Sequence, residues 1–180
     1  MFRQTFLALA LAATLPSAAL ADGHDKPDDG MGAAASMEIV DMNGEVTGSA
    51  FVRRTPSGAL FVTLSATGLT PGWHAVHLHE TGQCDPADGF KSAGGHVAEG
   101  KSHGVMSDNG PHPGDLPNQM VFAEGRLVAE MMAPPSLTMD MLTDADGAAL
   151  IIHSGRDDLT TQPSGEAGDR VACGVVTAQE

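Results

Sequence analysis

Trp73-His-Ala-Val-His-Leu-His-Glu80 is the stretch on which the interpretation of this chain depends. It has the character of a β-strand, in which His77 and His79 project from the same face. Two neutral imidazoles side by side are good metal ligands, whereas a lone histidine is more often a hydrogen-bonded core or surface residue. Further ligand-type side chains follow along the chain: His96, His103, His112, Asp115 and His153. Together they predict a metal site.

Length and charge limit the classes of protein to consider. The chain has 180 residues and a formal net charge of −14. This length suits a single domain. So acidic a chain is not expected to bind nucleic acid or an anionic membrane surface, because both are negatively charged. An anionic substrate would need a local positive feature to offset the overall field.

The N-terminal segment has the features of an export signal. Arg3 provides a positive end, residues 6–15 are a short apolar run, and an A-x-A cleavage site follows. We therefore predict a signal peptide over residues 1–21 and an exported, periplasmic protein. The apolar run is too short to span a bilayer, and no later segment is apolar for long enough. Residues 22–36 are predicted to be a flexible acidic leader, and residues 37–180 the folded domain.

Cys84 and Cys173 are the two cysteines of the chain. An even count in an exported protein predicts a disulfide between them. They lie 89 positions apart, so loop closure would contribute roughly 4–5 kcal/mol of stability in an entropy-based model. The alternatives are two buried thiols or a cysteine-based zinc site, but neither cysteine has a C-x-x-C partner.

Short segments divided by turn residues follow the leader. Asn43-Gly44 is a strong hairpin signal. The predicted strands are residues 37–42, 46–53, 59–65, 73–80, 119–123, 126–133, 148–153 and 171–177. Such a series, without a convincing helix, predicts an all-β antiparallel sandwich or barrel. Residues 81–118 and 154–170 form two long loops, which are usually functional in a compact domain.

Five motifs together resemble the copper/zinc superoxide dismutases. They are Gly72-Trp-His-Ala-Val-His-Leu-His-Glu80, Gly94-Gly-His96, His112-Pro-Gly-Asp-Leu-Pro-Asn118, Ile151-Ile-His153 and Gly168-Asp-Arg-Val-Ala-Cys-Gly-Val175. Their order and most spacings agree with that family, and Gln162-Pro-Ser-Gly165 resembles its bacterial exported branch. The resemblance implies an eight-stranded antiparallel Greek-key barrel or sandwich. It also implies the disproportionation of superoxide to oxygen and hydrogen peroxide.

The resemblance further implies one copper and one zinc per chain. The copper ligands would be His77, His79, His96 and His153. The zinc ligands would be His96, His103, His112 and Asp115, so that His96 bridges the two ions. The chemistry of the donor sets agrees, because an all-imidazole set suits a redox-active copper and a closed three-histidine, one-aspartate set suits a structural zinc.

Asp157 matches a supporting residue of the family. It lies four positions after His153 and would accept hydrogen bonds from the free ring nitrogens of His77 and His103, which fixes both tautomers. The alternative is a solvated loop acid, the role expected for Asp158. For His74, which has the opposite strand parity to His77, the sequence predicts a structural role bonded to the backbone.

Arg170 matches the residue that guides the substrate in the family. It precedes Cys173 by three positions, and a guanidinium near copper would attract and orient a small anion. The alternative is a surface arginine paired with Glu166 or Asp169. The family account also gives His96 a catalytic role, since it carries a proton to the peroxide product.

One spacing departs from the family pattern. His96 and His103 are seven positions apart, a shorter gap than usual, and residues 97–100 lack the usual Asn-Pro. Glu99 is therefore a second candidate for an oxygen ligand to zinc.

An alternative function is an exported copper- or zinc-binding protein on the same fold without enzymatic activity. A four-histidine copper set together with Arg170 favours the enzyme, because metal storage needs no anion guide. The predicted partner is superoxide, with no nucleic acid and no membrane. The sequence shows no unambiguous dimer patch and leaves a homodimer open.

Cleavage after Ala21 would also create the N-terminus Asp22-Gly23-His24. Its amine, backbone amides and imidazole could bind Cu(II) or Ni(II) in a square plane.

Overall fold

The computed structural model describes residues 34–179, so the predicted signal peptide and nearly all of the predicted leader lie outside the described residues. Within that range the chain forms nine strands and two short 3-10 helices. The strands are β1 Ala35–Asp41, β2 Val46–Arg54, β3 Leu60–Ala66, β4 Gly72–His79, β5 Asp115–Val121, β6 Leu127–Met132, β7 Ala149–His153, β8 Arg170–Val175 and β9 Thr177–Ala178. The 3-10 helices are η1 Pro86–Asp88 and η2 Lys91–Ala93.

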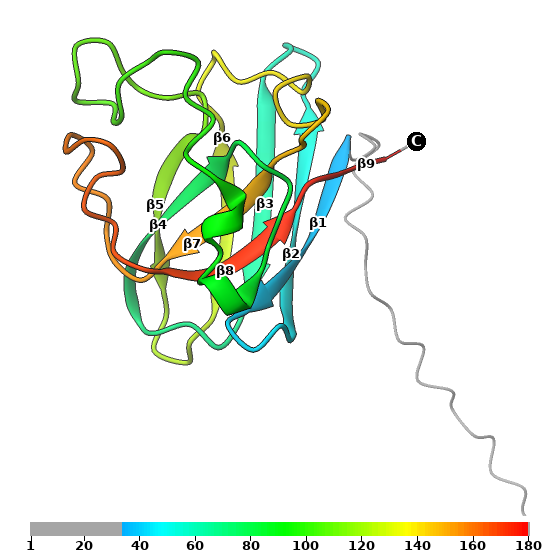
Figure 1. Cartoon of the computed structure of the whole chain (residues 1–180), viewed down its shortest axis with the longest axis vertical. Coiled ribbons are helices and arrows are strands. Elements are labelled where there is room, and N and C mark those ends of the chain that lie inside the picture. The colour runs from blue at the N-terminus through cyan, green and yellow to red at the C-terminus, as the bar shows by residue number, and fades with distance from the viewer. Residues whose placement is uncertain (1–33, 180) are drawn as a thin grey trace, which may run out of the picture.

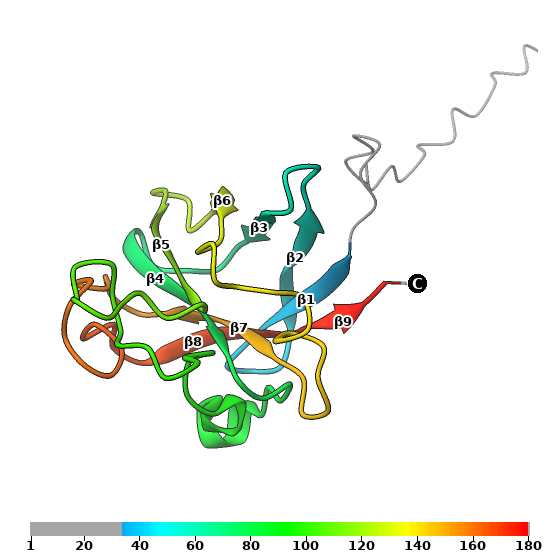
Figure 2. The ribbon, with the colours of Figure 1, turned by 90° about the horizontal axis from the view of Figure 1, so that it is seen from above.

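The strands form one antiparallel sheet that curls into a nearly closed barrel (Figures 1 and 2). Their order around the barrel is β5-β4-β7-β8-β1-β2-β3-β6, and β5 and β6 contact each other where the sheet closes. The connections β3 to β4 and β6 to β7 each pass over neighbouring strands, which is a Greek-key arrangement. The predicted fold class is confirmed, and β9 adds a short ninth strand beside β1.

Two strands start two or more residues earlier than the sequence predicts, whereas the other strand starts agree to within one residue. β1 begins at Ala35 rather than at residue 37, because Ala35 is fully buried and pairs with Val52 of β2. β5 begins at Asp115 rather than at residue 119, because Leu116 is buried in the core and pairs with Val76. The strand therefore presents Asp115 at the end where the loop enters it.

The barrel interior is filled by apolar side chains that alternate along the strands. β6 shows the pattern most clearly, since buried and exposed residues alternate over its whole length. β7 is different because all five of its residues are buried. Leu150 and Ile152 point into the barrel core, whereas Ala149 and Ile151 belong to a second cluster on the outer face. Complete burial of such leucine and isoleucine side chains contributes roughly 1.5–3 kcal/mol each.

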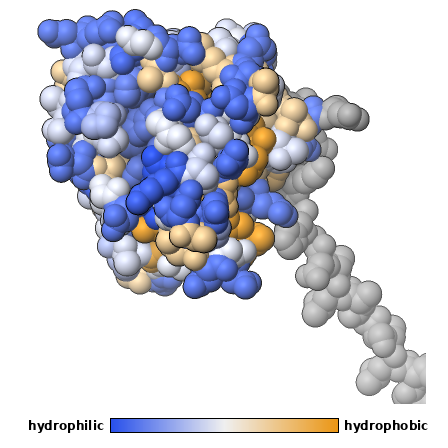
Figure 3. All heavy atoms as spheres, in the orientation of Figure 1, coloured by the Kyte–Doolittle hydropathy of each residue, from blue (hydrophilic) through white to orange (hydrophobic). Residues whose placement is uncertain are grey.

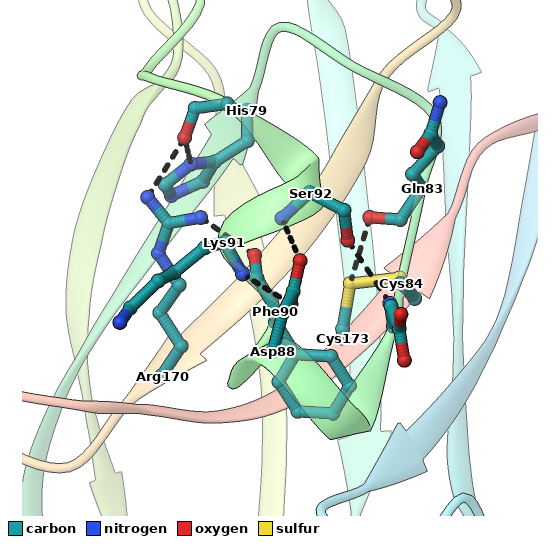
Figure 4. Close-up of a disulfide and its surroundings, with 11 residues drawn as sticks. His79, Gln83, Cys84, Asp88, Phe90, Lys91, Ser92, Arg170 and Cys173 are labelled. Atoms are coloured by element: carbon teal, nitrogen blue, oxygen red, sulfur yellow. Dashed lines mark hydrogen bonds between the residues drawn. A yellow bond between two sulfur atoms is a disulfide. The ribbon is translucent and has the colours of Figure 1, made fainter.

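The second cluster, here called the outer core, lies under the loop that carries η1 and η2. It consists of Phe90, Ala93, Ala149, Ile151 and Cys173, with Val40 and Cys84 packed against it. The predicted disulfide joins Cys84 to Cys173, with 5.7 Å between the Cα atoms. It therefore attaches the loop after β4 to β8 and holds it against the outside of the barrel (Figure 4).

The two predicted long loops, which occupy residues 80–114 and 154–169, lie on the same side of the barrel in both ribbon views (Figures 1 and 2). A third long connection, residues 133–148, joins β6 to β7. The molecular face in Figure 3 is mostly hydrophilic with scattered apolar residues. No helix within residues 34–179 is both long and apolar enough to cross a bilayer.

Candidate metal centre

Two imidazoles of the centre come from β4. Val76 and Leu78 of this strand are in the barrel core, so His77 and His79 project from the opposite, outer face. His153 ends β7 on the same face, and His96 forms an isolated β-bridge with His79. The ligand atoms of these four buried residues all lie within 4.8 Å of one another, and we call them the four-imidazole cluster.

One ring nitrogen of each residue in the four-imidazole cluster is buried and has no hydrogen-bond partner among the described residues. These atoms are His77 Nδ1, His79 Nε2, His96 Nε2 and His153 Nε2. An unpaired buried polar atom is costly, roughly 1–3 kcal/mol each. Four such nitrogens that converge on one point therefore fit a metal ion, and an all-imidazole donor set fits copper.

The second nitrogen of each of these rings is engaged by the protein, for His96 by Asp115 as described below. His79 Nδ1 lies 3.0 Å from the carbonyl oxygen of Gly94, and His153 Nδ1 lies 3.3 Å from that of Gly168. His77 Nε2 lies 3.0 Å from Asp157 Oδ2. An N–H that donates to these oxygens leaves a lone pair on the nitrogen that faces the cluster, which is the form that binds a metal.

A second group of ligand atoms surrounds one oxygen of Asp115. Asp115 Oδ1 lies 2.9 Å from His96 Nδ1, 3.1 Å from His103 Nδ1 and 3.2 Å from His112 Nδ1. His96 Nδ1 and His112 Nδ1 are 3.3 Å apart. In a tetrahedral zinc site, neighbouring ligand atoms are about 3.3 Å apart, given zinc–ligand bonds of roughly 2.0–2.1 Å. These four residues, here called the Asp115 cluster, therefore fit zinc.

The two clusters share His96, whose Nδ1 belongs to the Asp115 cluster and whose Nε2 belongs to the four-imidazole cluster. His77 is close to both, because its ring centroid lies 4.1 Å from that of His96 and its ligand atoms also lie within 4.8 Å of those of His103 and Asp115. We assign His77 to the four-imidazole cluster, since its Nε2 is engaged by Asp157 and only Nδ1 is unpaired.

Asp157 lies between the two clusters. Its Oδ1 is 3.0 Å from His103 Nε2 and its Oδ2 is 3.0 Å from His77 Nε2. Asn118 holds the backbone of Asp157 from both sides: its Oδ1 accepts from the Asp157 N–H at 2.8 Å and its Nδ2 donates to the Asp157 carbonyl at 2.9 Å. The sequence alone did not indicate this role of Asn118, although Asn118 is the last residue of the His112–Asn118 motif.

Burial keeps three imidazoles of the four-imidazole cluster neutral. It lowers the pKa of His77 to about 4, of His153 to about 3 and of His79 to about 2. These rings are therefore in the metal-binding form at neutral pH.

His103 behaves differently, because burial also opposes its charge but hydrogen bonds with two carboxylates outweigh that effect and raise its pKa to about 9. Those carboxylates, Asp115 and Asp157, are buried, yet the hydrogen bonds from His103 and its neighbours hold their pKa well below the usual range. The Asp115 cluster is therefore a place where positive charge is stabilised.

Arg170, the first residue of β8, is half-buried beside the four-imidazole cluster. Its Nη1 donates to the Phe90 carbonyl at 2.6 Å and its Nη2 to the Gly94 carbonyl at 2.7 Å (Figure 4). The Gly94 carbonyl is the same oxygen that His79 Nδ1 approaches. Within the described residues, Arg170 thus makes its hydrogen bonds with backbone carbonyls rather than with the loop acids considered as alternatives.

His74 and Glu99 lie outside both clusters. His74 contacts backbone oxygens on both sides, with Nδ1 at 2.5 Å from the His153 carbonyl and Nε2 at 2.7 Å from the Thr70 carbonyl. Glu99 is exposed, and the shortened loop brings His103 to Asp115 without it.

Fold and site together define a class: an all-β protein in which two adjacent clusters of metal-ligand side chains, on the outside of a barrel, share one histidine. The sequence profile of the family described as Copper/zinc superoxide dismutase (SODC) matches residues 46–176. The chain belongs to the copper/zinc superoxide dismutase family.

Individual relatives agree with this membership. The chain is 45% identical to a "Superoxide dismutase [Cu-Zn]" of Caulobacter vibrioides, over 74% of this chain and 80% of the relative. It is 42% identical to "Superoxide dismutase [Cu-Zn] 2" of Aquifex aeolicus, over 79% and 85% of the two chains. Among solved structures, a SOD-like protein from Bacillus subtilis superposes with a TM-score of 0.73 at 35% identity, over 79% of this chain and 97% of the other.

Proposed function

We propose that this chain disproportionates superoxide to oxygen and hydrogen peroxide. In this proposal copper is held by the four-imidazole cluster and a structural zinc by the Asp115 cluster. The observation that carries the proposal is the convergence of four buried, unpaired imidazole nitrogens. Copper, when bound there, supplies the one-electron exchange by which one superoxide is oxidised to oxygen and a second, with two protons, is reduced to hydrogen peroxide.

Arg170 binds and orients the superoxide anion in this mechanism. Two backbone carbonyls fix its guanidinium in place. Burial lowers the pKa of Arg170, but the ordinary pKa of arginine is so high that the group stays protonated. A fixed positive group at a cleft focuses the local field on a small anion. This local field offsets the net charge of −14 that would otherwise repel the substrate.

His96 holds and delivers a proton at Nε2. Its Nδ1 is engaged by the Asp115 cluster, so the ring would keep its place while Nε2 takes up and releases the proton. Asp157 supports the same geometry from the other side, because its two oxygens fix the tautomers of His77 and His103. The zinc ligands thereby hold a catalytic imidazole in position.

The competing function is metal binding without catalysis. The position of Arg170 favours catalysis, since a storage site gains nothing from a cation held beside a cationic metal. The test is to measure copper content and superoxide dismutation together on the mature protein and on two variants. His153→Ala should lose copper and activity while it keeps the fold. Arg170→Ala should keep copper but lose rate, with a weaker dependence on ionic strength.

Two results would contradict this proposal. Dismutation by His153→Ala at the wild-type rate would show that the four-imidazole cluster is not the catalytic site. A rate and a salt response of Arg170→Ala equal to those of the wild type would show that Arg170 does not guide the substrate.

We also propose that the protein works in the periplasm. The disulfide fits an oxidising compartment, and the N-terminal export pattern supports secretion. Cell fractionation and the intact mass of the mature protein test this. A cytoplasmic product that retains its first 21 residues would contradict it.

A further inference from the structure

Phe90 combines a buried side chain with an unfavourable backbone. Its ring is fully buried, and its backbone is left-handed, with φ 59° and ψ 21°. This conformation is costly for a residue that carries a bulky side chain, so it persists only where the surroundings hold it. The packing around Phe90 therefore has to stabilise a backbone conformation that the residue does not favour by itself.

The ring of Phe90 is the largest side chain of the outer core. It packs there with Ala149 and Ile151 of β7 and with Cys173 of β8. Ala149 and Ile151 lie on the outer face of β7, the face that also carries His153. The ring therefore anchors its loop to the part of the barrel surface on which the four-imidazole cluster is built.

The carbonyl of Phe90 points at the guanidinium of Arg170. It accepts a hydrogen bond from Arg170 Nη1 at 2.6 Å (Figure 4). It accepts another from the Ala93 N–H at 3.2 Å. The left-handed backbone sets the direction of this carbonyl. Two carbonyls, those of Phe90 and Gly94, thus hold the guanidinium from one side.

An acidic neighbour gives the guanidinium an alternative partner. The charge of Asp88 acts on Arg170, although the Asp88 carboxylate accepts from the Lys91 and Ser92 N–H groups at 2.8 and 2.9 Å. A guanidinium released from the Phe90 carbonyl could turn toward this carboxylate or toward solvent. The orientation of Arg170 therefore depends on the loop that Phe90 anchors.

We propose that Phe90 is a positioning residue for Arg170: its ring, fixed in the outer core, places the carbonyl that holds the guanidinium beside the four-imidazole cluster. This inference rests on the proposed role of Arg170 as the anion-binding residue. The disulfide attaches the same loop covalently, but Cys84 lies six positions before Phe90 and does not set the Phe90 backbone by itself.

The test uses azide as a small anionic probe, titrated into copper- and zinc-loaded protein and followed by the visible absorption of Cu(II). Phe90→Gly removes the ring, and glycine adopts the left-handed backbone at little cost. Any change in this variant is therefore due to the lost packing of the ring and not to backbone strain. We expect its metal content to match the wild type and its azide dissociation constant to rise roughly three- to tenfold, as expected when a focusing charge is misplaced. Phe90→Leu, which keeps an apolar side chain, should show a smaller rise.

A double-mutant cycle with Arg170→Gln shows whether Phe90 acts through Arg170. If it does, Phe90→Gly has little further effect on azide binding in the Arg170→Gln background. Leu64→Ala is the matched control, because Leu64 is buried in the barrel core on β3 and should lower stability without changing azide affinity.

The inference is overturned if Phe90→Gly leaves azide binding unchanged, or weakens it equally with and without Arg170. Should Phe90→Gly fail to fold, Phe90→Leu enters the same cycle and the same criteria apply. An Arg170→Gln protein with unaltered azide affinity would instead refute the proposed anion-guide role, so the two failures are distinguishable.

Discussion

Removal of the Cys84–Cys173 disulfide should cost the metal-free protein much of its stability. The bond closes a chain segment with a sequence separation of 89 residues and attaches residues 80–114 to β8. Several metal ligands lie in this segment, so the metal-free protein is the form in which the disulfide acts alone. The perturbation is the double variant Cys84→Ala/Cys173→Ala, with reduced wild type as its control.

The magnitude follows from the length of the closed loop. A crosslink over 89 residues reduces the entropy of the unfolded chain by roughly 15 cal/mol/K, which is about 4.6 kcal/mol at 25 °C. For a domain of this size each kcal/mol shifts the Tm by roughly 2–4 °C, so the Tm should fall by roughly 9–18 °C. Cys173 is fully buried in the outer core, so its loss adds a small packing cost in the double variant that reduced wild type does not have.

Urea unfolding of the metal-free proteins measures the free energy, and amide hydrogen exchange locates the change. We expect residues 80–114 to exchange faster before the barrel strands do, because the strands keep their own ladder hydrogen bonds. A reduced protein whose free energy of unfolding lies within about 1 kcal/mol of the oxidised one would refute the loop-closure reasoning. Faster exchange in β2 and β3 but not in the loop would refute the predicted location.

Three further predictions address the zinc ligands, the loop around Asp157 and the N-terminus. His103→Ala should release zinc and lower the Tm more than the activity, because the four-imidazole cluster does not include His103; full zinc occupancy by metal analysis would show that another ligand, such as Glu99, had been recruited. Gly165→Ala should destabilise the protein by roughly 2 kcal/mol or more, since Gly165 has φ 71° and an added Cβ would collide with Asp157 and His103. Gly58→Ala is the matched control in chemical denaturation, with φ 89° but open space around it, and an equal loss in the two variants would contradict the predicted collision. The N-terminus Asp22-Gly23-His24 lies outside the described residues. The metal-loaded mature protein should bind one extra Cu(II) there, and the His24→Ala variant should not. Equal Cu(II) uptake by the two proteins, or a mature chain that starts at another residue, would refute this prediction.

The fold class and the residues that gather at the site could be predicted from the sequence alone. Turn signals such as Asn43-Gly44 act locally, and strand periodicity shows which side chains share a face, so both can be recognised in one dimension. The same periodicity placed His77 and His79 together and turned His74 away from them, as the structure has it. The pairing of Cys84 with Cys173 needed only their number and the export pattern.

The start of β5 and the hydrogen-bond partners of the site depended on tertiary structure. Residue 115 was predicted to lie in a loop, but Leu116 is drawn into the core by β4, which makes this segment a strand. No local pattern shows which carbonyl will face Arg170, since every residue has a carbonyl and only the folded loop selects those of Phe90 and Gly94.

The division of the ligands between two sites was also decided in three dimensions. From the sequence alone, the assignment rested on resemblance to a family; in the structure it rests on which nitrogen of each ring already has a partner. His96 is the clearest case, because its two nitrogens face different clusters. Strand period and spacing show that histidines will meet, but the direction of each ring nitrogen is set by contacts between loops far apart in the chain, and those contacts exist only once the barrel has closed.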